Sequence, residues 1–207
     1  MSILFCTPCY GGMATAGYTC SVLKLKDELN RVGLDHDFQI GTNESLVTRA
    51  RNEMTAAFLG SKYTHMMWID ADILFEPEDV GKVWNLEADI GVGCYAMKKQ
   101  DKQWFAAWKG GELIKDLDQF KEPIEVDYAG TGFMLIKREV IETLAKVSPS
   151  YEGQVCRVPA LYMTPIHEDG FESEDYHFCR IAREAGFKVM MDPSVRLGHI
   201  GQYCFGG

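Results

Sequence analysis

The chain has 207 residues, of which 46% are hydrophobic and 25% charged, the composition of one globular domain with a substantial core. Its net charge of −9 argues against a general nucleic-acid-binding surface, for which a basic face is expected. No apolar run reaches membrane-spanning length and no basic-then-apolar leader opens the chain, so we expect a cytoplasmic protein without a membrane span. Seven cysteines, several in apolar segments, favour reduced thiols over a disulfide framework.

The N-terminal part of the chain predicts a strand, a helix and a second strand. Residues 3–6 form an apolar run, and the apolar positions after it recur every three or four residues up to Val32, before Gly33. This spacing indicates an amphipathic helix that ends at Gly33, followed by a strand over 34–40. A right-handed crossover of this kind places the turn after the first strand at the carboxyl edge of the sheet. That turn lacks the glycine patterns of dinucleotide-binding and P-loop sites.

The next helix carries two arginines near its start. We expect it to begin at a cap on Asn43 or Ser45 and to end at Gly60. Cations are disfavoured near a helix N-terminus, so Arg49 and Arg51 are unusual there. An anion or a base carbonyl beside the helix would explain one of them, although the pattern does not tell which.

Two carboxylates follow the apolar run 66–69. Side chains at alternate positions of a strand point the same way, so Asp70 and Asp72 converge at its C-terminal end. Open α/β sheets bind their ligands at this edge. Because two adjacent carboxylates repel each other unless a cation or proton compensates, the pair favours a cation site over a solvated turn with Asp70 as a helix cap.

The middle of the chain predicts a helix over 77–86, a strand over 89–96, and irregular or short antiparallel pieces over 97–126. The aromatic cluster with Trp104 and Trp108 in that segment is either a satellite core or a contact for a sugar ring. Gly130, Thr131 and Gly132 precede another apolar strand. Their small size permits close approach of a ligand, or simply marks the start of the strand.

The C-terminal part begins with a long segment, 148–170, which predicts a functional lid or a disordered loop. A helix capped by Ser173 follows, with Glu174 and Asp175 in its first turn. A last strand over 188–191 is expected to end at Asp192 and Pro193, and His199 follows it. The two acids either satisfy the helix dipole or do chemistry, and the order of the motifs favours chemistry.

Taken in order, these motifs resemble GT-A-fold glycosyltransferases, and the resemblance spans nearly the whole chain. It implies an α/β fold with a Rossmann-like, mostly parallel central sheet flanked by helices and a short antiparallel element. It also implies one GT-A domain over residues 1–207, either the whole protein or the N-terminal part of a longer one. The compact layout is similar to a small virus-encoded member of the family, which would place the protein in the host cytoplasm.

The resemblance implies roles for particular residues. Mn²⁺ or Mg²⁺ is held by Asp72 and His199, while Asp70 contacts the ribose or a metal-bound water. The residues expected at the nucleotide are Thr7, Pro8, Cys9, Tyr10, Arg49, Arg51, Asp70 and Ala71. The residues expected near the donor or acceptor sugar are Gly130, Thr131, Gly132 and Trp104. In an inverting enzyme Glu174 or Asp175 deprotonates the acceptor hydroxyl, whereas in a retaining one these acids only position substrates.

The function predicted on this basis is metal-dependent transfer of a sugar, from UDP-glucose or another UDP-hexose, to a hydroxyl of a glycan or glycoprotein. Two alternatives remain. A metal-dependent nucleotidyltransferase also uses paired acids, but it typically has a basic first loop, and the loop around Tyr10 has no basic residue. A non-catalytic nucleotide-sugar-binding domain would need no catalytic base.

Overall fold

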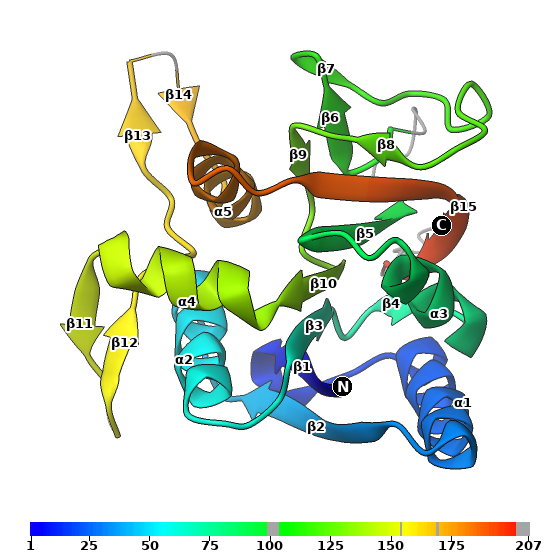
Figure 1. The fold of residues 1–207 in the computed structure, drawn as a ribbon, viewed down its shortest axis with the longest axis horizontal. Coiled ribbons are helices and arrows are strands. Elements are labelled where there is room, and N and C mark those ends of the chain that lie inside the picture. The colour runs from blue at the N-terminus through cyan, green and yellow to red at the C-terminus, as the bar shows by residue number, and fades with distance from the viewer. Residues whose placement is uncertain (99–103, 154, 169, 202–207) are drawn as a thin grey trace, which may run out of the picture.

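The computed structural model describes residues 1–98, 104–153, 155–168 and 170–201, and its centre is an eight-stranded mixed sheet with helices on both faces (Figure 1). Along the sheet the strands follow the order β2-β1-β3-β10-β5-β15-β4, and β8 pairs with β15. The strands are β1 (Ser2–Cys9), β2 (Asp35–Thr42), β3 (His65–Ile69), β4 (Ile73–Leu74), β5 (Ile90–Tyr95), β8 (Ile124–Glu125), β10 (Phe133–Lys137) and β15 (Val189–His199). The longest of them are mutually parallel, whereas β10 runs antiparallel to both β3 and β5. The predicted α/β architecture with a mostly parallel central sheet is confirmed.

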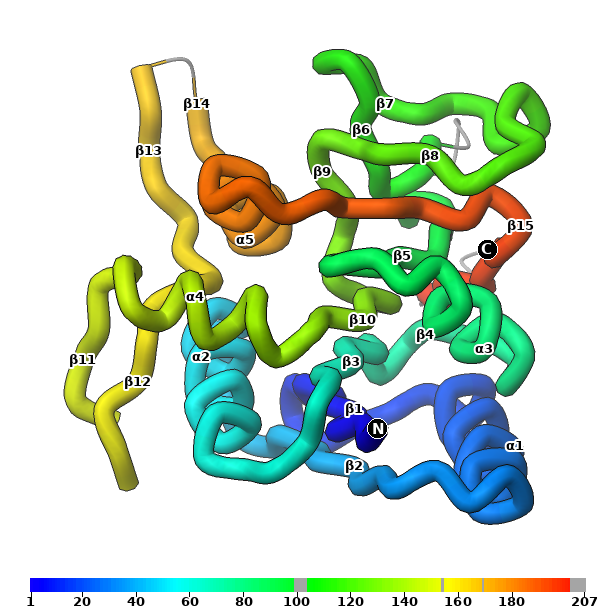
Figure 2. The backbone as a smooth tube through the Cα atoms, in the orientation of Figure 1, coloured from blue at the N-terminus to red at the C-terminus, as the bar shows by residue number. Residues whose placement is uncertain are grey.

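The helices form two layers around the sheet (Figure 2). One face is covered by α1 (Ala16–Val32) and α3 (Pro77–Asn85), and the other by α2 (Val47–Leu59), α4 (Arg138–Val147) and α5 (Glu174–Glu184). A short 3-10 helix, η1 (Tyr10–Gly12), follows β1. Successive side chains of β3 alternate between two cores, with Met66 and Trp68 under α2, α4 and α5 and with Met67 and Ile69 under α1 and α3. None of the helices in the described ranges is long and apolar enough to cross a bilayer.

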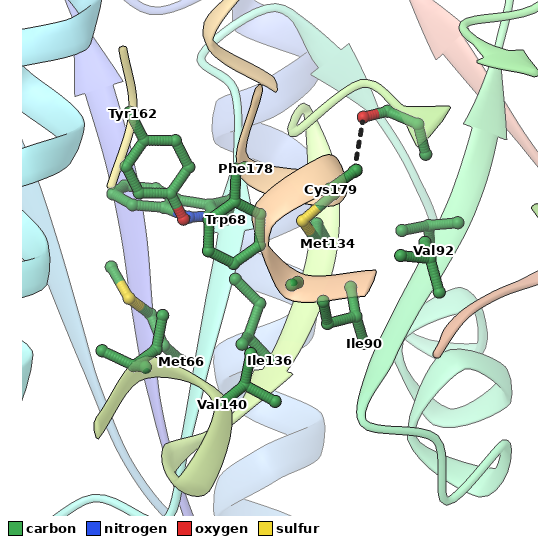
Figure 3. Close-up of a cluster of buried hydrophobic side chains, with 14 of the residues drawn as sticks. Met66, Trp68, Ile90, Val92, Met134, Ile136, Val140, Tyr162, Phe178 and Cys179 are labelled. Atoms are coloured by element: carbon green, nitrogen blue, oxygen red, sulfur yellow. Dashed lines mark hydrogen bonds between the residues drawn. The ribbon is translucent and has the colours of Figure 1, made fainter. Parts of the chain in front are cut away.

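The segment 148–170 is folded against the core and is not disordered in its described part, whereas its role as a lid stays a prediction. It carries β11 (Ser150–Glu152) paired with β12 (Arg157–Pro159), and β13 (Ile166–His167) paired with β14 (Gly170–Phe171). Between these hairpins Tyr162 is fully buried, stacks on Phe178 and accepts a hydrogen bond from Nε1 of Trp68 at 2.7 Å (Figure 3). The side chain of Asn52 accepts hydrogen bonds from the backbone N–H groups of Leu161 and Tyr162. These bonds fasten the segment to α2.

The last strand is longer than its sequence suggests. We expected it to end at Asp192 and Pro193, but β15 continues to His199 through a register shift between Met191 and Arg196 against β5. A bulge of this kind accommodates a proline, which cannot donate a ladder hydrogen bond. The prediction of an early end is therefore wrong, and the continuation carries His199 to the carboxyl edge of the sheet.

The segment 97–126 contains short antiparallel strands, as expected. A small sheet of β7 (Glu112–Leu113), β6 (Ala107–Lys109) and β9 (Tyr128–Ala129) lies beside the main one, while residues 99–103 are outside the described ranges. Because β10 is antiparallel, its first residue lies opposite the last residue of β3, Ile69. The glycine segment before β10 therefore reaches the same edge as the two aspartates.

Candidate functional site

A pocket of about 650 Å³ opens at the carboxyl edge of the sheet, between the end of β1, the start of α2 and the turn after β3. Seven of the residues predicted to bind nucleotide or metal line it: Pro8, Cys9, Tyr10, Arg51, Asp70, Ala71 and Asp72. Tyr10 is 74% exposed, so its ring face is open to a ligand. The backbone N–H and the hydroxyl of Thr15, at the start of α1, both donate to the carbonyl of Ala71, which fixes the turn that holds the aspartates.

Two of the predicted nucleotide residues lie outside this pocket. Thr7 is buried under it, and its hydroxyl hydrogen-bonds the hydroxyl of Tyr18 at 2.6 Å. Arg49 forms a bidentate ion pair with Glu44, with Nε to Oε2 at 2.5 Å and Nη2 to Oε1 at 2.8 Å, and lines a neighbouring pocket. Of the two arginines, only Arg51 therefore reaches the pocket.

Glu44 is a pocket residue that the sequence analysis missed. Its carboxylate accepts a hydrogen bond from the backbone N–H of Leu46 at 2.9 Å, and Leu46 is the N-cap residue of α2. The expected capping by Asn43 or Ser45 is therefore wrong. An acid just before a helix that begins with arginines was the available signal.

Arg51 lies between Asp70, in the turn after β3, and Glu174, at the start of α5. Its side chain is 3% exposed, and Nη2 donates to Asp70 at 2.9 Å (Oδ1) and 3.2 Å (Oδ2). On the other side Nε lies 3.6 Å from Oε1 of Glu174. Burial works against the charged guanidinium, but the charges of Asp70 and Glu174 outweigh it and raise the pKa of Arg51 above its ordinary value. Within the described structure, Nε and Nη1 have no hydrogen-bond partner.

Asp72 lies close to His199. The pairing of β4 with β15 places Ile73 opposite His199, and the N–H of Ile200 donates to the carbonyl of Asp72 at 2.9 Å. As a result, Nε2 of His199 lies 3.6 Å from Oδ1 of Asp72. Nδ1 of the same ring is 2.9 Å from the carbonyl oxygen of Ala96, which can only accept, so Nδ1 carries a proton and the other nitrogen faces the carboxylate.

Lys98 is the other partner of Asp72, with Nζ 2.5 Å from Oδ2. Burial alone would raise the pKa of Asp72, but the interactions with His199 and Lys98 lower it to about 2. The carboxylate is thus ionised over the physiological range, with the Lys98 ammonium on one side and the His199 imidazole on the other.

Asp72 and His199 together fit a divalent cation whose other ligands come from outside the protein. A separation of 3.6 Å suits two donors of one coordination shell with bonds of about 2.0–2.2 Å. Carboxylate oxygen and neutral imidazole nitrogen both suit Mn²⁺, whereas Mg²⁺ prefers an all-oxygen shell. In the described ranges no third His, Cys, Asp or Glu completes a protein-only metal site. The remaining positions would therefore be filled by water or by substrate oxygens.

Asp175 is an acid with a raised pKa at the start of α5. It accepts hydrogen bonds from the hydroxyl of Ser173 and from the backbone N–H of Tyr176. Ser173 is the N-cap residue, as predicted, but its hydroxyl serves this carboxylate and not the helix backbone. Burial, and then the charge of Glu174, raises the pKa of Asp175 to about 6. A carboxylate of this kind gains and loses a proton near neutral pH.

Tyr95 is a buried residue of the site that could not be recognised in the sequence, because it ends an ordinary apolar strand. Burial and the charges of Asp70 and Asp175 raise its pKa well above the usual value. Its hydroxyl accepts a hydrogen bond from the N–H of Gly132 at 3.0 Å, and its ring meets that of His199 edge-on at 5.1 Å. The Tyr95 side chain thus contacts both the glycine segment before β10 and His199 at the end of β15.

The residues predicted near the sugars do not line the nucleotide pocket. A Cβ on Gly130 would lie 2.1 Å from the Tyr95 hydroxyl, and one on Gly132 would lie 2.8 Å from it. Packing against Tyr95 therefore accounts for both glycines, and Thr131 between them is buried. The carbonyl of Trp104 accepts a hydrogen bond from the N–H of Met97 at 2.7 Å.

No protein-family model matches the sequence, and no curated protein matches it. Solved structures do match in fold. A197 from STIV aligns with a TM-score of 0.63 at 19% identity, over 98% of this chain and 87% of that one. GalNAc-T7 with UDP, GalNAc and Mn²⁺ aligns with a TM-score of 0.60 at 13% identity, over 98% of this chain and 43% of that one. The catalytic domain of Drosophila β1,4-galactosyltransferase 7 in complex with xylobiose aligns with a TM-score of 0.52 at 15% identity, over 99% and 76%.

At these identities the matches establish the fold alone. The mixed, mostly parallel sheet flanked by helices is GT-A-like, as the sequence predicted. The nearer likeness to a small virus-encoded member stays a prediction.

Proposed function

We propose that this chain is a metal-dependent glycosyltransferase that moves a sugar from a UDP-sugar, UDP-glucose or another UDP-hexose, to a hydroxyl of a glycan or glycoprotein. The observation that carries the proposal is the approach of His199 to Asp72 at the rim of a pocket large enough for a nucleotide. The volume of about 650 Å³ falls within the range of about 300–1,000 Å³ that is typical of small-molecule sites.

The lining residues of the pocket suggest how the donor nucleotide would lie. The exposed ring of Tyr10 offers a stacking face to the base, and Asp70 and Ala71 line the same pocket. The start of α1 also faces the pocket through Thr15, and the positive end of a helix dipole favours phosphate. The diphosphate would then lie next to Asp72 and His199, so the sugar points toward α5.

A divalent cation between Asp72 and His199 would act as a Lewis acid toward the leaving diphosphate and hold it in place. A local cation is needed because the chain as a whole carries a net charge of −9. Lys98 supplies one positive charge at this position through its contact with Asp72. The imidazole ligand favours Mn²⁺ over Mg²⁺.

Asp175 is our choice for the catalytic base. In the transfer step the acceptor oxygen bonds to the anomeric carbon, the bond from that carbon to the phosphate oxygen breaks with its electron pair going to the diphosphate, and the acceptor proton moves to Asp175. A base is most effective when its pKa lies near the working pH, and the pKa of Asp175 is raised to about 6. Glu174 is instead directed at Arg51. This role requires inversion at the anomeric carbon, which NMR of the product checks.

The test is a screen of nucleotide sugars for UDP release with Mn²⁺ and with a chelator. We expect Mn²⁺-dependent release for at least one UDP-hexose, and its loss in Asp72→Ala. Asp27→Asn, on the exposed side of α1, is the matched control and should keep full turnover. Unchanged turnover in Asp72→Ala would remove the cation from the mechanism. UDP binding without any turnover would favour a binding domain, and pyrophosphate release from a nucleoside triphosphate and a sugar phosphate would favour a nucleotidyltransferase.

A further inference from the structure

A second pocket of about 240 Å³ lies beside α5 and shares no lining residue with the nucleotide pocket. Figure 1 shows α5 between the β13–β14 hairpin and the small sheet that contains β6 and β9. Side chains from all of these parts enclose the pocket. Its lining consists of four aromatic residues with three others: Trp108, Tyr128, Phe171 and Tyr176, with His167, Gly170 and Glu172.

The aromatic rings are held in place by one another. Nε1 of Trp108 donates a hydrogen bond to the hydroxyl of Tyr176 at 2.8 Å, and the two rings meet edge-on at 6.3 Å. Tyr128 lies 5.3 Å from Tyr176, with the ring planes tilted by 36°. A preorganised wall of this kind presents ring faces to a ligand at little entropic cost.

Phe171 differs from the other three aromatic residues because it is exposed, whereas they are half-buried. Its side chain is 69% exposed on a two-residue strand, where it gains little from folding. The rim beside it is polar and ordered. Glu172 accepts hydrogen bonds from Arg180, and its Oε2 lies 3.1 Å from Nδ1 of His177 and 3.3 Å from Nε2 of His167.

The pocket also begins next to the proposed base. Glu172 is followed by Ser173, Glu174 and Asp175, and Tyr176 comes directly after them at the start of α5. The backbone N–H of Tyr176 donates a hydrogen bond to a carboxylate oxygen of Asp175 at 2.9 Å. Burial, and then the charge of Asp175, raises the pKa of the Tyr176 phenol to about 12. A molecule seated on the aromatic wall would therefore lie near the start of α5, where Asp175 is found.

We propose that this aromatic pocket binds one ring of a neutral oligosaccharide, the acceptor of the transfer. A pyranose ring has a face of C–H groups that packs on an aromatic ring and an equator of hydroxyls that need hydrogen-bond partners. The wall supplies the ring faces, and the Tyr176 hydroxyl and the rim of His167 and Glu172 supply the partners. The described lining residues include no Lys or Arg, which favours a neutral sugar over an anionic ligand. The role of this sugar as the acceptor rests on the proposed function, whereas the binding of a sugar here does not.

The test is titration of the full chain with cellobiose, lactose, mannobiose and xylobiose, without nucleotide or metal. Saturation-transfer NMR and tryptophan fluorescence report binding. Phe171→Ala removes a mostly exposed ring and should leave the fold intact, so it avoids the risk that Trp108→Phe disturbs β6. Ile166→Ala is the matched control, because Ile166 is 84% exposed and lies directly opposite Phe171 in the same hairpin but outside the pocket.

We expect at least one disaccharide to bind, and Phe171→Ala to weaken it about 3- to 10-fold, the effect of losing one aromatic contact. Ile166→Ala should bind the disaccharide as the wild type does, and the KM for transfer to that disaccharide should rise by the same factor in Phe171→Ala but stay unchanged in Ile166→Ala. Sugar binding that is equal in Phe171→Ala, in Trp108→Phe and in the wild type overturns the proposal, as does capture of peptides without any sugar. If no UDP-sugar is turned over but the disaccharide still binds through Phe171, sugar binding holds and the transferase function fails.

Discussion

Nε2 of His199 faces Oδ1 of Asp72 at 3.6 Å because the end of β15 pairs with the two-residue strand β4. Only Gly198 and His199 make this pairing, and a Cβ on Gly198 would lie 3.0 Å from the Cβ of Leu74. The imidazole ring of His199 is further held by the hydrogen bond from its Nδ1 to the carbonyl of Ala96. The proposed cation site therefore depends on a short piece of sheet that joins the middle of the chain to its C-terminal part.

Removal of the imidazole should weaken cation binding without unfolding the protein. We expect His199→Ala to lose Mn²⁺ affinity by on the order of 10- to 100-fold or more, since loss of even an outer partner of a metal site has effects of that size. Electron paramagnetic resonance of free Mn²⁺ in the presence of UDP measures it. His36→Ala is the control, because Nδ1 of His36 also meets a backbone carbonyl, that of Leu34, but far from the pocket. Equal Mn²⁺ affinity in both variants would contradict the assignment.

Lys98 competes with a cation for Asp72. Its Nζ contacts Oδ2 at 2.5 Å, and both side chains are substantially exposed. Ion pairs of this exposure contribute about 0–1 kcal/mol, so Lys98→Ala should bind Mn²⁺ alone up to about fivefold more tightly. Calorimetric titration without nucleotide gives the affinity, and Lys24→Ala, which breaks an exposed pair with Glu76, is the control. Weaker Mn²⁺ binding in Lys98→Ala would mean that the lysine assists the cation.

Gly130 is small because Tyr95 lies against it. Gly130→Ala places a Cβ 2.1 Å from the hydroxyl oxygen and should lower the free energy of unfolding by about 1–3 kcal/mol. Tyr95→Phe removes that oxygen, so the double variant should lose less than the sum of the single losses. Denaturant unfolding of all four proteins measures the cycle. Gly81→Ala, which meets nothing within 4 Å in α3, should be neutral or stabilising, and additive losses at Tyr95 and Gly130 would contradict the clash.

The helices and strands could be predicted because their apolar residues recur at spacings typical of each element. The apolar run of β3 and the three-and-four spacing of α1 identify a buried strand and an amphipathic helix without any tertiary information. The direction of β10 could not be predicted, since a strand buried on both faces has the same pattern in either direction. The continuation of β15 beyond Pro193 was also hidden, because proline normally ends a strand.

The site was predictable where chemistry shows in the residue types and hidden where it depends on packing. Asp70 and Asp72 stand out as two acids after an apolar run. Arg49 and Arg51 look alike in sequence. Because residues two apart in a helix lie on different sides of it, only one of them can face Asp70, and the tertiary fold decides which one does. Tyr95 resembles any aromatic residue at the end of a core strand.

The contribution of Asp175 to the free energy of unfolding should be less favourable at neutral pH than at acid pH. Its pKa is raised from 3.8 to about 6 in the folded state, so the native protein disfavours the charged form. Well below pH 3.8 the group is protonated in both states and costs nothing; the penalty grows as pH rises from 3.8 to about 6 and is constant above that. Asp175→Asn keeps an oxygen for the Ser173 hydroxyl and the Tyr176 N–H but carries no charge. We expect it to raise the free energy of unfolding by about 1–3 kcal/mol at pH 8 and by about 0.5 kcal/mol or less at pH 4.

Denaturant unfolding at the two pH values measures this difference, and Asp27→Asn on the exposed side of α1 should show none at either pH. The same Asp175→Asn variant should lose glycosyl transfer, because a neutral amide cannot take the acceptor proton. Higher stability with lost turnover is the signature of an acid retained for function at a cost to the fold. If Asp175→Asn is no more stable than the wild type at pH 8, the carboxylate is satisfied by its hydrogen bonds, and a raised pKa would no longer support its assignment as the base.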